Sequence, residues 1–563
     1  MPMNRRHFMQ LSGALGLASL PRWGRDAMWL GRSRRADLLL RGGTVYDGTG
    51  TPPVAVDVAL EGDRIVGLGP NLAVRGAPEI DVRGMAVAPG FIDIHSHTDR
   101  VLLINPRAES KIRQGVTSEI IGQDGSSLGP WRSTRSPADP DEVVDVAGFF
   151  ERIERDGTAV NIASMIGAGT VRGEVIGDDD RPATPEELAR MVALVKEAIA
   201  GGACGLSSGL EYVPGGFADL DELIALAGPL RGTGLPYASH MRNEDDQLMA
   251  AIEEALAVGR RAGVPVQVSH LKAQGRRNWW KAEPVLHTLE RAAGAAGPGE
   301  VTFDRYPYVA YSTGLASLFP LWSRDGGTTA LLGRLRDGGD RERIEAAVRG
   351  KITKLGDWDA VQITSADTPD GGLDWIAGRR LGDLARERGQ EPYALLVQIM
   401  LAGNGEIGMV GFGMSEENTA MFLAHPLGMI CSDSSAHATY GPLSQGSPHP
   451  RAYGSFPRVL GHYCRDEKIM PLTTGIHKMT GMPARKLRLE GRGSIAVGAF
   501  ADLVVFDPGS VADRATFTDP HQYPVGINLV VVNGRVVVRD GEHSGELPGR
   551  ALRPVRGKGR AGE

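Results

Sequence analysis

The chain has little cysteine, no excess of positive charge and no long apolar run. Three cysteines among 563 residues, Cys204, Cys431 and Cys464, are too few and too scattered for a disulfide framework or a cysteine-based structural zinc site. Lysine and arginine number 62 against 68 aspartates and glutamates, a net charge of −6, and no basic stripe is interleaved with aromatic residues. We therefore expect buried free thiols and no nucleic-acid partner.

Two ligand-binding motifs are also missing. No strand leads into a Gly-x-Gly-x-x-Gly turn, and no phosphate-binding Gly-Lys-Ser/Thr loop occurs. No segment is long and apolar enough to span a bilayer, so we expect no stable membrane anchor. With 563 residues and 42% hydrophobic content, the chain can bury a large core, and its length fits one large domain plus a small one.

The N-terminus resembles a twin-arginine export signal. Arg5 and Arg6 precede a mild apolar stretch over residues 11–20, which is too short to cross a membrane. The alternative is an N-terminal arm that holds two arginines by chance. The resemblance implies a signal and leader over residues 1–35, folding and metal uptake in the cytoplasm, and export to the periplasm through the twin-arginine machinery.

The two ends of the remaining chain share a β-rich pattern. Residues 36–81 show a pattern of short strands and turns. The same pattern occurs at 501–507 and 529–538, where Asn533-Gly534 is a strong hairpin signal. Neither piece alone has enough strands to be stable. We interpret residues 36–85 and 486–553 as two parts of one small β-sandwich, followed by a tail over 554–563.

The middle of the chain, residues 86–485, alternates strand and helix. Thr184-Pro-Glu-Glu187 offers an N-cap, a proline at the first helical position and a glutamate that closes a capping box, and Gly201 ends the helix. Strand-like runs follow at 204–210, 235–240, 264–270 and 301–308. This pattern is typical of βαβ units, with an insertion near 325–425.

Polar residues repeatedly follow these apolar strands. In a TIM-type (β/α)8 barrel that edge carries the active site. A doubly wound open sheet also places ligands there, but the β-rich ends favour the barrel. We therefore predict an α/β fold, a (β/α)8 barrel with a small β-sandwich built from both chain ends. The strand-end residues are His95, His97, His240, His270, Asp304 and Asp433.

His95 and His97 end an apolar strand that begins at Val87. Residues two apart on a strand project to the same face, and neutral imidazole is a common ligand of zinc. An isolated His-x-His is equally consistent with two surface histidines. The other strand-end ligands favour a metal-binding pair.

Eight segments of the chain carry a family resemblance that spans residues 36–553. The chain resembles the amidohydrolase superfamily, and within it the N-acyl-D-amino-acid deacylase (D-aminoacylase) family. The segments are Gly90-Phe-Ile-Asp-Ile-His-Ser-His97, Gly205-Leu-Ser-Ser-Gly-Leu-Glu-Tyr-Val-Pro214, Ser239-His-Met-Arg-Asn-Glu244, Ser269-His-Leu-Lys272, Met429-Ile-Cys-Ser-Asp433, His449-Pro-Arg-Ala-Tyr-Gly-Ser-Phe456, Tyr523-Pro-Val-Gly-Ile527 and Pro548-Gly-Arg550.

The resemblance implies a hydrolase that uses zinc, as one or two divalent ions. His95 and His97 would hold one metal position, and His240 and His270 the neighbouring one. Zinc lowers the pKa of bound water to about 7. Asp433 would accept a proton from that water and return it to the departing amine.

The chain departs from the family pattern at Asp124. Many of these deacylases carry Gly-Asn-Cys-Gly where this chain has Gly122-Gln-Asp-Gly125. A carboxylate can bind or bridge zinc, but it is a harder ligand than thiolate and can favour another divalent ion. The alternative is a turn residue before Gly125. Metal number and identity stay open.

The resemblance places Tyr212, Lys272 and Arg451 near the α-carboxylate of the substrate. Arginine suits a carboxylate because its planar fork donates two parallel hydrogen bonds. The alternatives are an aromatic wall residue for Tyr212 and a solvated strand-end lysine for Lys272. The loop residues His437 and His449 are interpreted as ordinary surface residues, and Asp304 as a residue that holds a neighbouring loop.

Ser312 and Leu318 follow in a segment that the sequence places near the side-chain pocket. No second cation stands in that segment to bind an acidic substrate. We therefore expect a neutral or apolar N-acyl-amino acid.

The favoured function is cleavage of N-acyl-D-amino acids to a carboxylate and a free D-amino acid. One alternative is a cyclic amide hydrolase, like hydantoinases and dihydroorotases, or a dipeptidase on the same scaffold. Those relatives commonly bridge two metals through a carboxylated lysine, and no lysine takes a convincing strand-end position here. A remote alternative is a nonenzymatic binding protein. The oligomeric state stays open.

Overall fold

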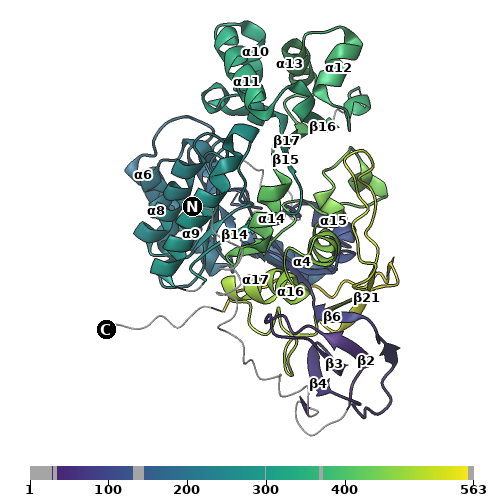
Figure 1. Cartoon of the computed structure of the whole chain (residues 1–563). Coiled ribbons are helices and arrows are strands. Elements are labelled where there is room, and N and C mark those ends of the chain that lie inside the picture. The colour runs from purple at the N-terminus through teal and green to yellow at the C-terminus, as the bar shows by residue number, and fades with distance from the viewer. Residues whose placement is uncertain (1–27, 30–34, 131–144, 298, 367–371, 556–563) are drawn as a thin grey trace, which may run out of the picture.

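The computed structural model describes residues 28–29, 35–130, 145–297, 299–366 and 372–555. The predicted export signal and nearly all of the C-terminal tail lie outside these residues. Within them, no helix combines the length and the apolar character needed to cross a membrane. Figure 1 shows a helical lobe at the top, an α/β body in the middle and a β-rich part at the bottom.

The β-rich part is one mixed sheet that contains strands from both ends of the chain. Strand β6 pairs in parallel with β2 and antiparallel with β19, so N-terminal strands continue directly into C-terminal ones. Short β1 lies within the predicted leader and pairs with β4. The strands are β1 (Met28–Trp29), β2 (Leu38–Val45), β3 (Val54–Glu61), β4 (Arg64–Gly69), β5 (Glu79–Asp81), β6 (Ala86–Pro89), β19 (Leu503–Phe506), β20 (Ile527–Val532), β21 (Arg535–Arg539) and β22 (Glu542–His543).

The predicted hairpin at Asn533-Gly534 is confirmed. Strands β20 and β21 are antiparallel, and the φ angles of Asn533 and Gly534 are 46° and 79°. Positive φ at both central residues is the geometry that a two-residue hairpin requires, because its twist matches that of the flanking strands. The same sequence signal therefore fixes the register of this edge of the sheet.

The body is built from parallel strands that form two adjoining sheets. Only Met165 separates β9 from β10, and a parallel bridge between Ser96 and Ser434 connects the segments that follow β7 and β18. The two sheets thus meet at both edges. Their strands are β7 (Phe91–Asp93), β8 (Val116–Ile121), β9 (Asn161–Ser164), β10 (Ile166–Gly167), β11 (Leu206–Gly209), β12 (Tyr237–His240), β13 (Val266–Val268), β14 (Val301–Arg305) and β18 (Gly428–Ile430).

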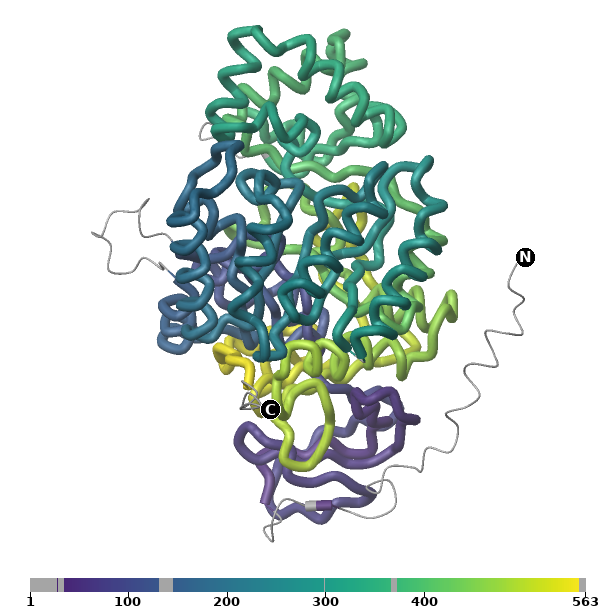
Figure 2. Tube along the Cα trace, turned by 90° about the vertical axis from the view of Figure 1, so that its left-hand side faces the viewer, coloured from purple at the N-terminus to yellow at the C-terminus, as the bar shows by residue number. Residues whose placement is uncertain are grey.

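Helices alternate with these strands, and Figure 2 shows the blue and teal ones upright and side by side. The predicted capping box is present: Thr184 accepts from the backbone of Glu187, and α6 runs from Pro185 until Gly201 stops it. The helices are α2 (Val101–Ile104), α3 (Glu109–Ile112), α4 (Val146–Asp156), α5 (Ala168–Val175), α6 (Pro185–Ala200), α7 (Leu220–Ala227), α8 (Leu248–Ala262), α9 (Ala282–Ala296), α14 (Glu416–Ala424), α15 (Arg451–Arg458), α16 (Leu472–Met479) and α17 (Gly481–Lys486).

The helical lobe at the top of Figure 1 interrupts the alternation between β14 and β18. It spans residues 310–412, so it starts earlier than the insertion expected near 325–425. A small antiparallel sheet in the order β15-β17-β16 connects it to the body. Its elements are β15 (Ala310–Gly314), α10 (Gly327–Asp337), α11 (Arg341–Leu355), β16 (Val361–Ala366), α12 (Leu381–Arg388), α13 (Pro392–Ala402) and β17 (Ile407–Phe412).

The predicted α/β class is correct, and the three cysteines are buried and free, as expected. The carboxyl ends of the parallel strands meet at one edge of the body, below the lobe. Loops at this edge therefore bring residues together that are hundreds of positions apart in the sequence.

Candidate metal centre and active site

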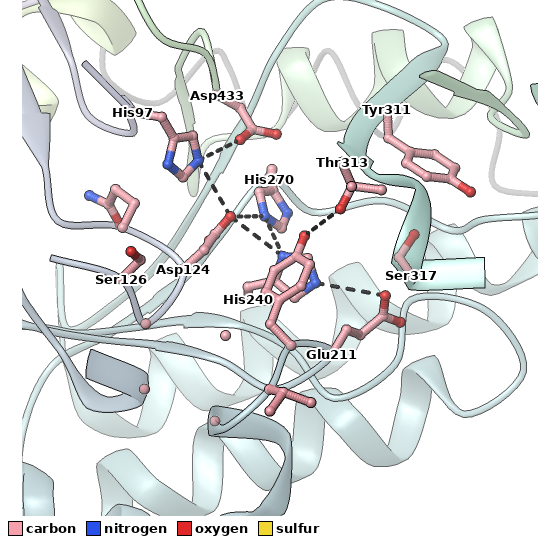
Figure 3. A pocket seen from close by; sticks show the side chains of 18 of the residues that line it. His97, Asp124, Ser126, Glu211, His240, His270, Tyr311, Thr313, Ser317 and Asp433 are labelled. Atoms are coloured by element: carbon pink, nitrogen blue, oxygen red, sulfur yellow. Dashed lines mark hydrogen bonds and ion pairs between the residues drawn. The ribbon is translucent and has the colours of Figure 1, made fainter. Parts of the chain in front are cut away.

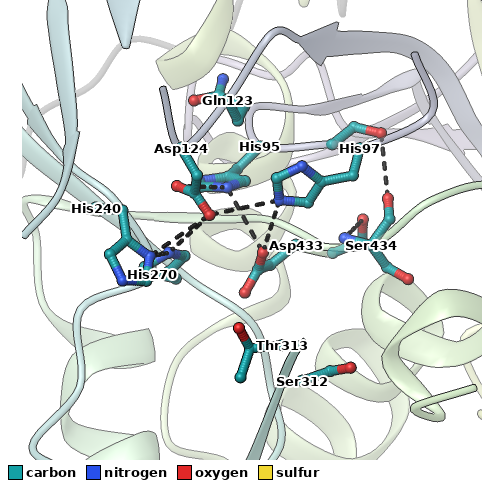
Figure 4. Close-up of polar contacts among 12 residues, drawn as sticks. His95, His97, Gln123, Asp124, His240, His270, Ser312, Thr313, Asp433 and Ser434 are labelled. Carbon is teal, nitrogen blue, oxygen red and sulfur yellow. Dashed lines mark hydrogen bonds and ion pairs between the residues drawn. The ribbon is translucent and has the colours of Figure 1, made fainter. Parts of the chain in front are cut away.

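His95 and His97 lie just beyond the end of β7, with ring centroids 5.2 Å apart. His95 is fully buried, whereas the His97 side chain is 33% exposed. Both rings face the same two carboxylates. His95 Nε2 is 3.3 Å from Asp124 Oδ1, and His97 Nε2 is 3.2 Å from Asp433 Oδ1. The two histidines therefore converge on one point (Figure 4).

His240 and His270 stand opposite this pair, at the ends of β12 and β13. His240 Nδ1 lies 2.9 Å from His270 Nε2. Both nitrogens also face Asp124, whose Oδ2 is 3.6 Å from His240 Nδ1 and 3.3 Å from His270 Nε2. Asp124 thus lies between the two histidine pairs, which places its carboxylate where it can contact two neighbouring ions.

The backbone at these ligand positions is strained. Asp124, Asp433 and His270 have φ angles of 52°, 52° and 32°, which residues with a Cβ rarely adopt. Each such residue costs about 1–3 kcal/mol and persists because its surroundings enforce it. Below Asp124, a Cβ at Gly209 would come within 2.0 Å of the Asp124 carbonyl oxygen, so this close approach requires glycine.

The donor set fits a divalent metal ion. One ligand atom from each of His95, His97, Asp124 and Asp433 lies within 4.8 Å of the others, and the same holds for Asp124, His240 and His270. Imidazole and carboxylate are ligands of zinc. The buried atoms His95 Nε2 and Asp124 Oδ1 have no hydrogen-bond partner. Buried polar atoms are normally paired, so the convergence of these two atoms fits ligands of a bound cation.

The carboxylates around the histidines also favour a bound cation. Burial alone would lower the pKa of His97, but Asp124 and Asp433 outweigh it and raise that pKa to about 9. At His240, Glu244 and Asp124 likewise overcome burial and raise the pKa to about 10. Carboxylates that favour protons on buried imidazoles also favour a cation between them.

Asp433 follows β18 and is held as an ionised carboxylate. Arg451 Nη1 donates to Asp433 Oδ2 over 2.6 Å. Burial would raise the pKa of Asp433, but Arg451 and the neighbouring histidines hold it well below its usual range. Asp433 therefore combines a position beside the metal ligands with the capacity to accept a proton.

Two carboxylates lie near the outer nitrogens of the histidine ligands. Glu244 Oε1 is 3.1 Å from His270 Nδ1, and Asp304 Oδ1 is 3.4 Å from His95 Nδ1, which makes no hydrogen bond within the described part of the chain. Carboxylates close to a metal-binding histidine help to orient its ring and raise its basicity. Asp304 also accepts from the backbone N–H of His270 at 2.7 Å, so it holds a neighbouring loop, as expected, and contacts the site as well.

Lys111 connects the segment that carries His95 and His97 to the segment that carries Asp433. Its fully buried Nζ donates to Asp93 Oδ2 at 2.9 Å, to Ser432 Oγ at 2.6 Å and to the Ser434 carbonyl at 2.7 Å. Asp93 precedes the His95 pair, and the two serines flank Asp433. Sequence reasoning missed this lysine because it lies in α3, outside every recognisable motif.

A cavity of about 790 Å³ opens over the centre, and all three residues expected to bind substrate line it. The Tyr212 hydroxyl is 3.2 Å from Thr313 Oγ1. Lys272 Nζ donates to Glu244 Oε1 at 2.5 Å and lies 2.7 Å from His270 Nδ1, so much of its donor capacity is already used. Arg451 keeps a buried Nε without a hydrogen-bond partner.

The expected positions of three surrounding residues, His449, Leu318 and His437, need correction. His449 is not a surface residue: it is buried, its Nε2 lies 2.9 Å from the Ala310 carbonyl, and its Nδ1 accepts from the backbone N–H of Arg451. Ser312 lines the cavity, but Leu318 packs into the adjacent hydrophobic core. The segment around Ser312 carries no second cation, as expected, but α11 of the lobe brings Lys351 to the cavity. His437 is partly buried, with its backbone N–H bound to Ser110.

The comparisons with known proteins cover nearly the whole chain. Residues 78–294 and 441–538 match the amidohydrolase family. A D-aminoacylase of Alcaligenes xylosoxydans xylosoxydans is 37% identical, over 92% of this chain and 98% of the relative. An N-acyl-D-aspartate deacylase of the same organism is also 37% identical, over 92% of this chain and 95% of that protein.

A crystal structure of N-acyl-D-glutamate deacylase from Bordetella bronchiseptica has the same fold, with a TM-score of 0.77 and 31% identity. The match covers 92% of this chain and 100% of that one. That protein was crystallised with zinc and a phosphonate inhibitor, a mimic of the tetrahedral intermediate of its reaction.

Proposed function

Since the chain belongs to the amidohydrolase family, we propose that it is a metal-dependent hydrolase that cleaves the amide bond of N-acyl-D-amino acids. The products are a carboxylate and a free D-amino acid. The observation that carries the proposal is the convergence of two histidine pairs with Asp124 and Asp433 beneath one cavity. The D-aminoacylase and the N-acyl-D-aspartate deacylase, each 37% identical, support the substrate class.

We propose zinc as the metal, in one or two positions that share Asp124. His95 and His97 belong to one position, and His240 and His270 to the other. A divalent ion held by these residues would supply Lewis-acid chemistry, which polarises a carbonyl and lowers the pKa of bound water to about 7. The carboxylate of Asp124 stands where many deacylases of this group carry a thiolate, which is a softer ligand.

Asp433 is the general base and then the general acid. Its ionised carboxylate accepts a proton from the attacking water while the new C–O bond forms. It returns that proton to the amine nitrogen while the C–N bond breaks. Lys111 supports both steps indirectly, because it holds the segment on either side of Asp433 against the segment that carries His95 and His97.

Arg451 anchors the α-carboxylate of the substrate, with help from Tyr212 and Lys272. All three line the cavity. Arg451 is the strongest anchor, because its guanidinium is a permanent cation that lines the cavity beside Asp433. Because Arg451 is in direct contact with Asp433, a substrate carboxylate bound to Arg451 keeps the scissile bond within reach of the base.

We also propose a closed barrel with a small β-sandwich as the architecture, and the periplasm as the location of the protein. The adjoining edges of the two parallel sheets support a closed (β/α)8 barrel, and the mixed sheet from both chain ends supports a small β-sandwich. Arg5 and Arg6, with the apolar stretch after them, support export to the periplasm by the twin-arginine route.

A substrate panel tests the proposed function. Purified zinc-loaded protein is incubated with N-acetyl-D- and N-acetyl-L-amino acids, D-dipeptides and hydantoins, and released amine or opened ring is measured. Selective hydrolysis of the N-acetyl-D compounds is expected. Turnover of hydantoins or dipeptides alone would move the chain to a neighbouring branch of the family.

A further inference from the structure

The cavity wall beyond His240 carries a carboxylate that the proposed reaction does not use. Glu211 follows β11, directly before Tyr212, and its side chain is 17% exposed. Figure 3 shows it beside His240, on the side of that ring away from Asp433. Glu211 Oε2 is 3.8 Å from His240 Nε2, which is too long for a hydrogen bond.

The lysines of this wall already have carboxylate partners. Lys351 Nζ lies 3.7 Å from Asp245 Oδ2, and Lys272 Nζ is bound to Glu244. Among the described residues, by contrast, no lysine or arginine makes an ion pair with Glu211 within 4.0 Å. Lys351 is the cation that acts most strongly on Glu211, from beyond that distance, and Arg324 acts on it as well. A partly exposed carboxylate that makes no direct ion pair with a cation still repels a second anion in the cavity and attracts a hydrogen-bond donor.

We propose that Glu211 selects substrates by the charge of their side chain. N-acyl-D-amino acids with a side chain that ends in a hydrogen-bond donor, such as a carboxamide or a cation, are accepted. Those with an acidic side chain are disfavoured. This inference rests on the proposed function and adds the substrate class. It also changes the expectation of a neutral or apolar side chain to one that ends in a hydrogen-bond donor, since an apolar group would leave Glu211 desolvated without a partner.

Sequence similarity does not decide this point. The chain is 37% identical both to a D-aminoacylase and to an N-acyl-D-aspartate deacylase. The wall itself is the informative feature: Ser317, Tyr311 and Glu211 face the same space in Figure 3. These groups supply hydroxyls and one negative charge.

Glu211 has one rival role, which is to orient His240. In that case removal of its charge would slow every substrate by the same factor and would weaken metal binding. Charge selection, by contrast, changes the ratio between substrates and leaves the metal in place. The two roles therefore differ in what is measured.

The test compares N-acetyl-D-glutamine with N-acetyl-D-glutamate, which have nearly the same shape and differ in charge. The kcat/KM of both is measured for the wild type, Glu211→Gln and the control Lys351→Met, together with zinc per chain. We expect the wild type to prefer the glutamine compound by about tenfold or more. In Glu211→Gln that ratio should fall towards one, with unchanged zinc content.

Binding of the same two compounds to zinc-loaded Asp433→Asn and Asp433→Asn/Glu211→Gln, measured by calorimetry, gives the same ratio without turnover. The inference is wrong if the wild type prefers the glutamate compound, if the ratio survives in Glu211→Gln, or if Lys351→Met selectively loses the glutamate compound. A wild type that hydrolyses no N-acyl-D-amino acid refutes the proposed function instead, and the binding ratio then still decides the role of Glu211.

Discussion

Arg451 Nη1 donates a 2.6 Å hydrogen bond to Asp433 Oδ2, so the expected substrate anchor and the proposed base are in direct contact. Both side chains are nearly buried, with exposures of 5% and 7%. A charge-assisted bond in such surroundings strongly favours the ionised carboxylate. Binding of the α-carboxylate and readiness of the base are thereby linked through one guanidinium.

Replacement of Arg451 by methionine should change the pH profile as well as KM. Asp433 loses the cation that lowers its pKa, so its pKa rises. The acid limb of kcat/KM should therefore move to higher pH by about 1–3 units. KM should increase because the substrate carboxylate loses its partner.

The matched control is Arg458→Met, which removes an arginine from the same helix. Arg458 donates to the Pro307 carbonyl and does not line the cavity. Its profile should match that of the wild type. An acid limb that stays in place in Arg451→Met would show that the arginine does not control Asp433.

Asp124 should decide how much metal the centre holds. Its carboxylate faces both histidine pairs, so Asp124→Ala removes a ligand from each position. We expect a loss of zinc affinity greater than the roughly 10–100-fold that changes to outer partners cost. Competition with a chelator measures it.

Asp124→Cys is the informative companion variant. A thiolate is a softer ligand for zinc than a carboxylate, so zinc binding should be retained. After substitution with cobalt, a sulfur-to-cobalt charge-transfer band should appear only in this variant. Absence of the band would place residue 124 outside the coordination sphere.

We expect Lys111 to stabilise the packing of the His95–His97 segment against the segment that carries Asp433. Lys111→Met leaves Asp93 and Glu119 buried without their cation, since Lys111 Nζ is 2.9 Å from the first and 3.4 Å from the second. Breaking a buried pair from one side costs about 3–5 kcal/mol. Denaturant unfolding should show that loss, and kcat should fall more than KM rises.

The double variant Lys111→Met/Asp93→Asn separates charge from shape. It removes one of the two orphaned carboxylates, so part of the lost stability should return. A double variant as unstable as the sum of the single variants would contradict the proposed role of the ion pair.

The local elements were predictable from local signals. Thr184 and Glu187 cap α6, and Asn533-Gly534 turns the last hairpin, because both signals act within a few residues. The strand-end histidines were also visible, since two residues on one strand share a face. Family resemblance then supplied the roles of Asp433 and Arg451.

The supporting residues could not be predicted, because tertiary packing alone brings them to the site. Lys111 and Ser432 are separated by 321 positions, and Lys351 reaches the cavity from an inserted lobe. By sequence His449 is interpreted as a surface residue of a loop, yet it is buried and its Nε2 lies 2.9 Å from the Ala310 carbonyl of β15. No periodicity or motif records such contacts.

Acid should loosen the contact between the lobe and the body. Asp246 of the body lies 3.0 Å from Lys354 of α11 and also binds Arg277. Burial would raise the pKa of Asp246, but Arg277, Lys354 and Asn278 outweigh it and lower that pKa to about 2. The stabilisation is thus full above the ordinary pKa of 3.8 and is lost as pH falls towards 2.

Thermal unfolding of the wild type and Asp246→Asn at pH 6 and pH 3 measures this effect. The variant should be less stable at pH 6, and the difference should shrink at pH 3. The effect should be small because the pair is partly solvated. Lys354→Met should reproduce part of it at pH 6, and a difference that grows in acid would contradict the assignment.

The most direct test of the account is metal reconstitution of the wild type and Asp433→Asn. Zinc is removed with a chelator and added back while hydrolysis of N-acetyl-D-glutamine and its L-enantiomer is followed, with bound zinc counted in parallel. We predict that zinc restores hydrolysis of the D-compound alone, and that Asp433→Asn still binds zinc through the histidines and Asp124 but is slower by about 10²–10⁴-fold. Full activity without metal, or an Asp433→Asn variant as fast as the wild type, would contradict the account.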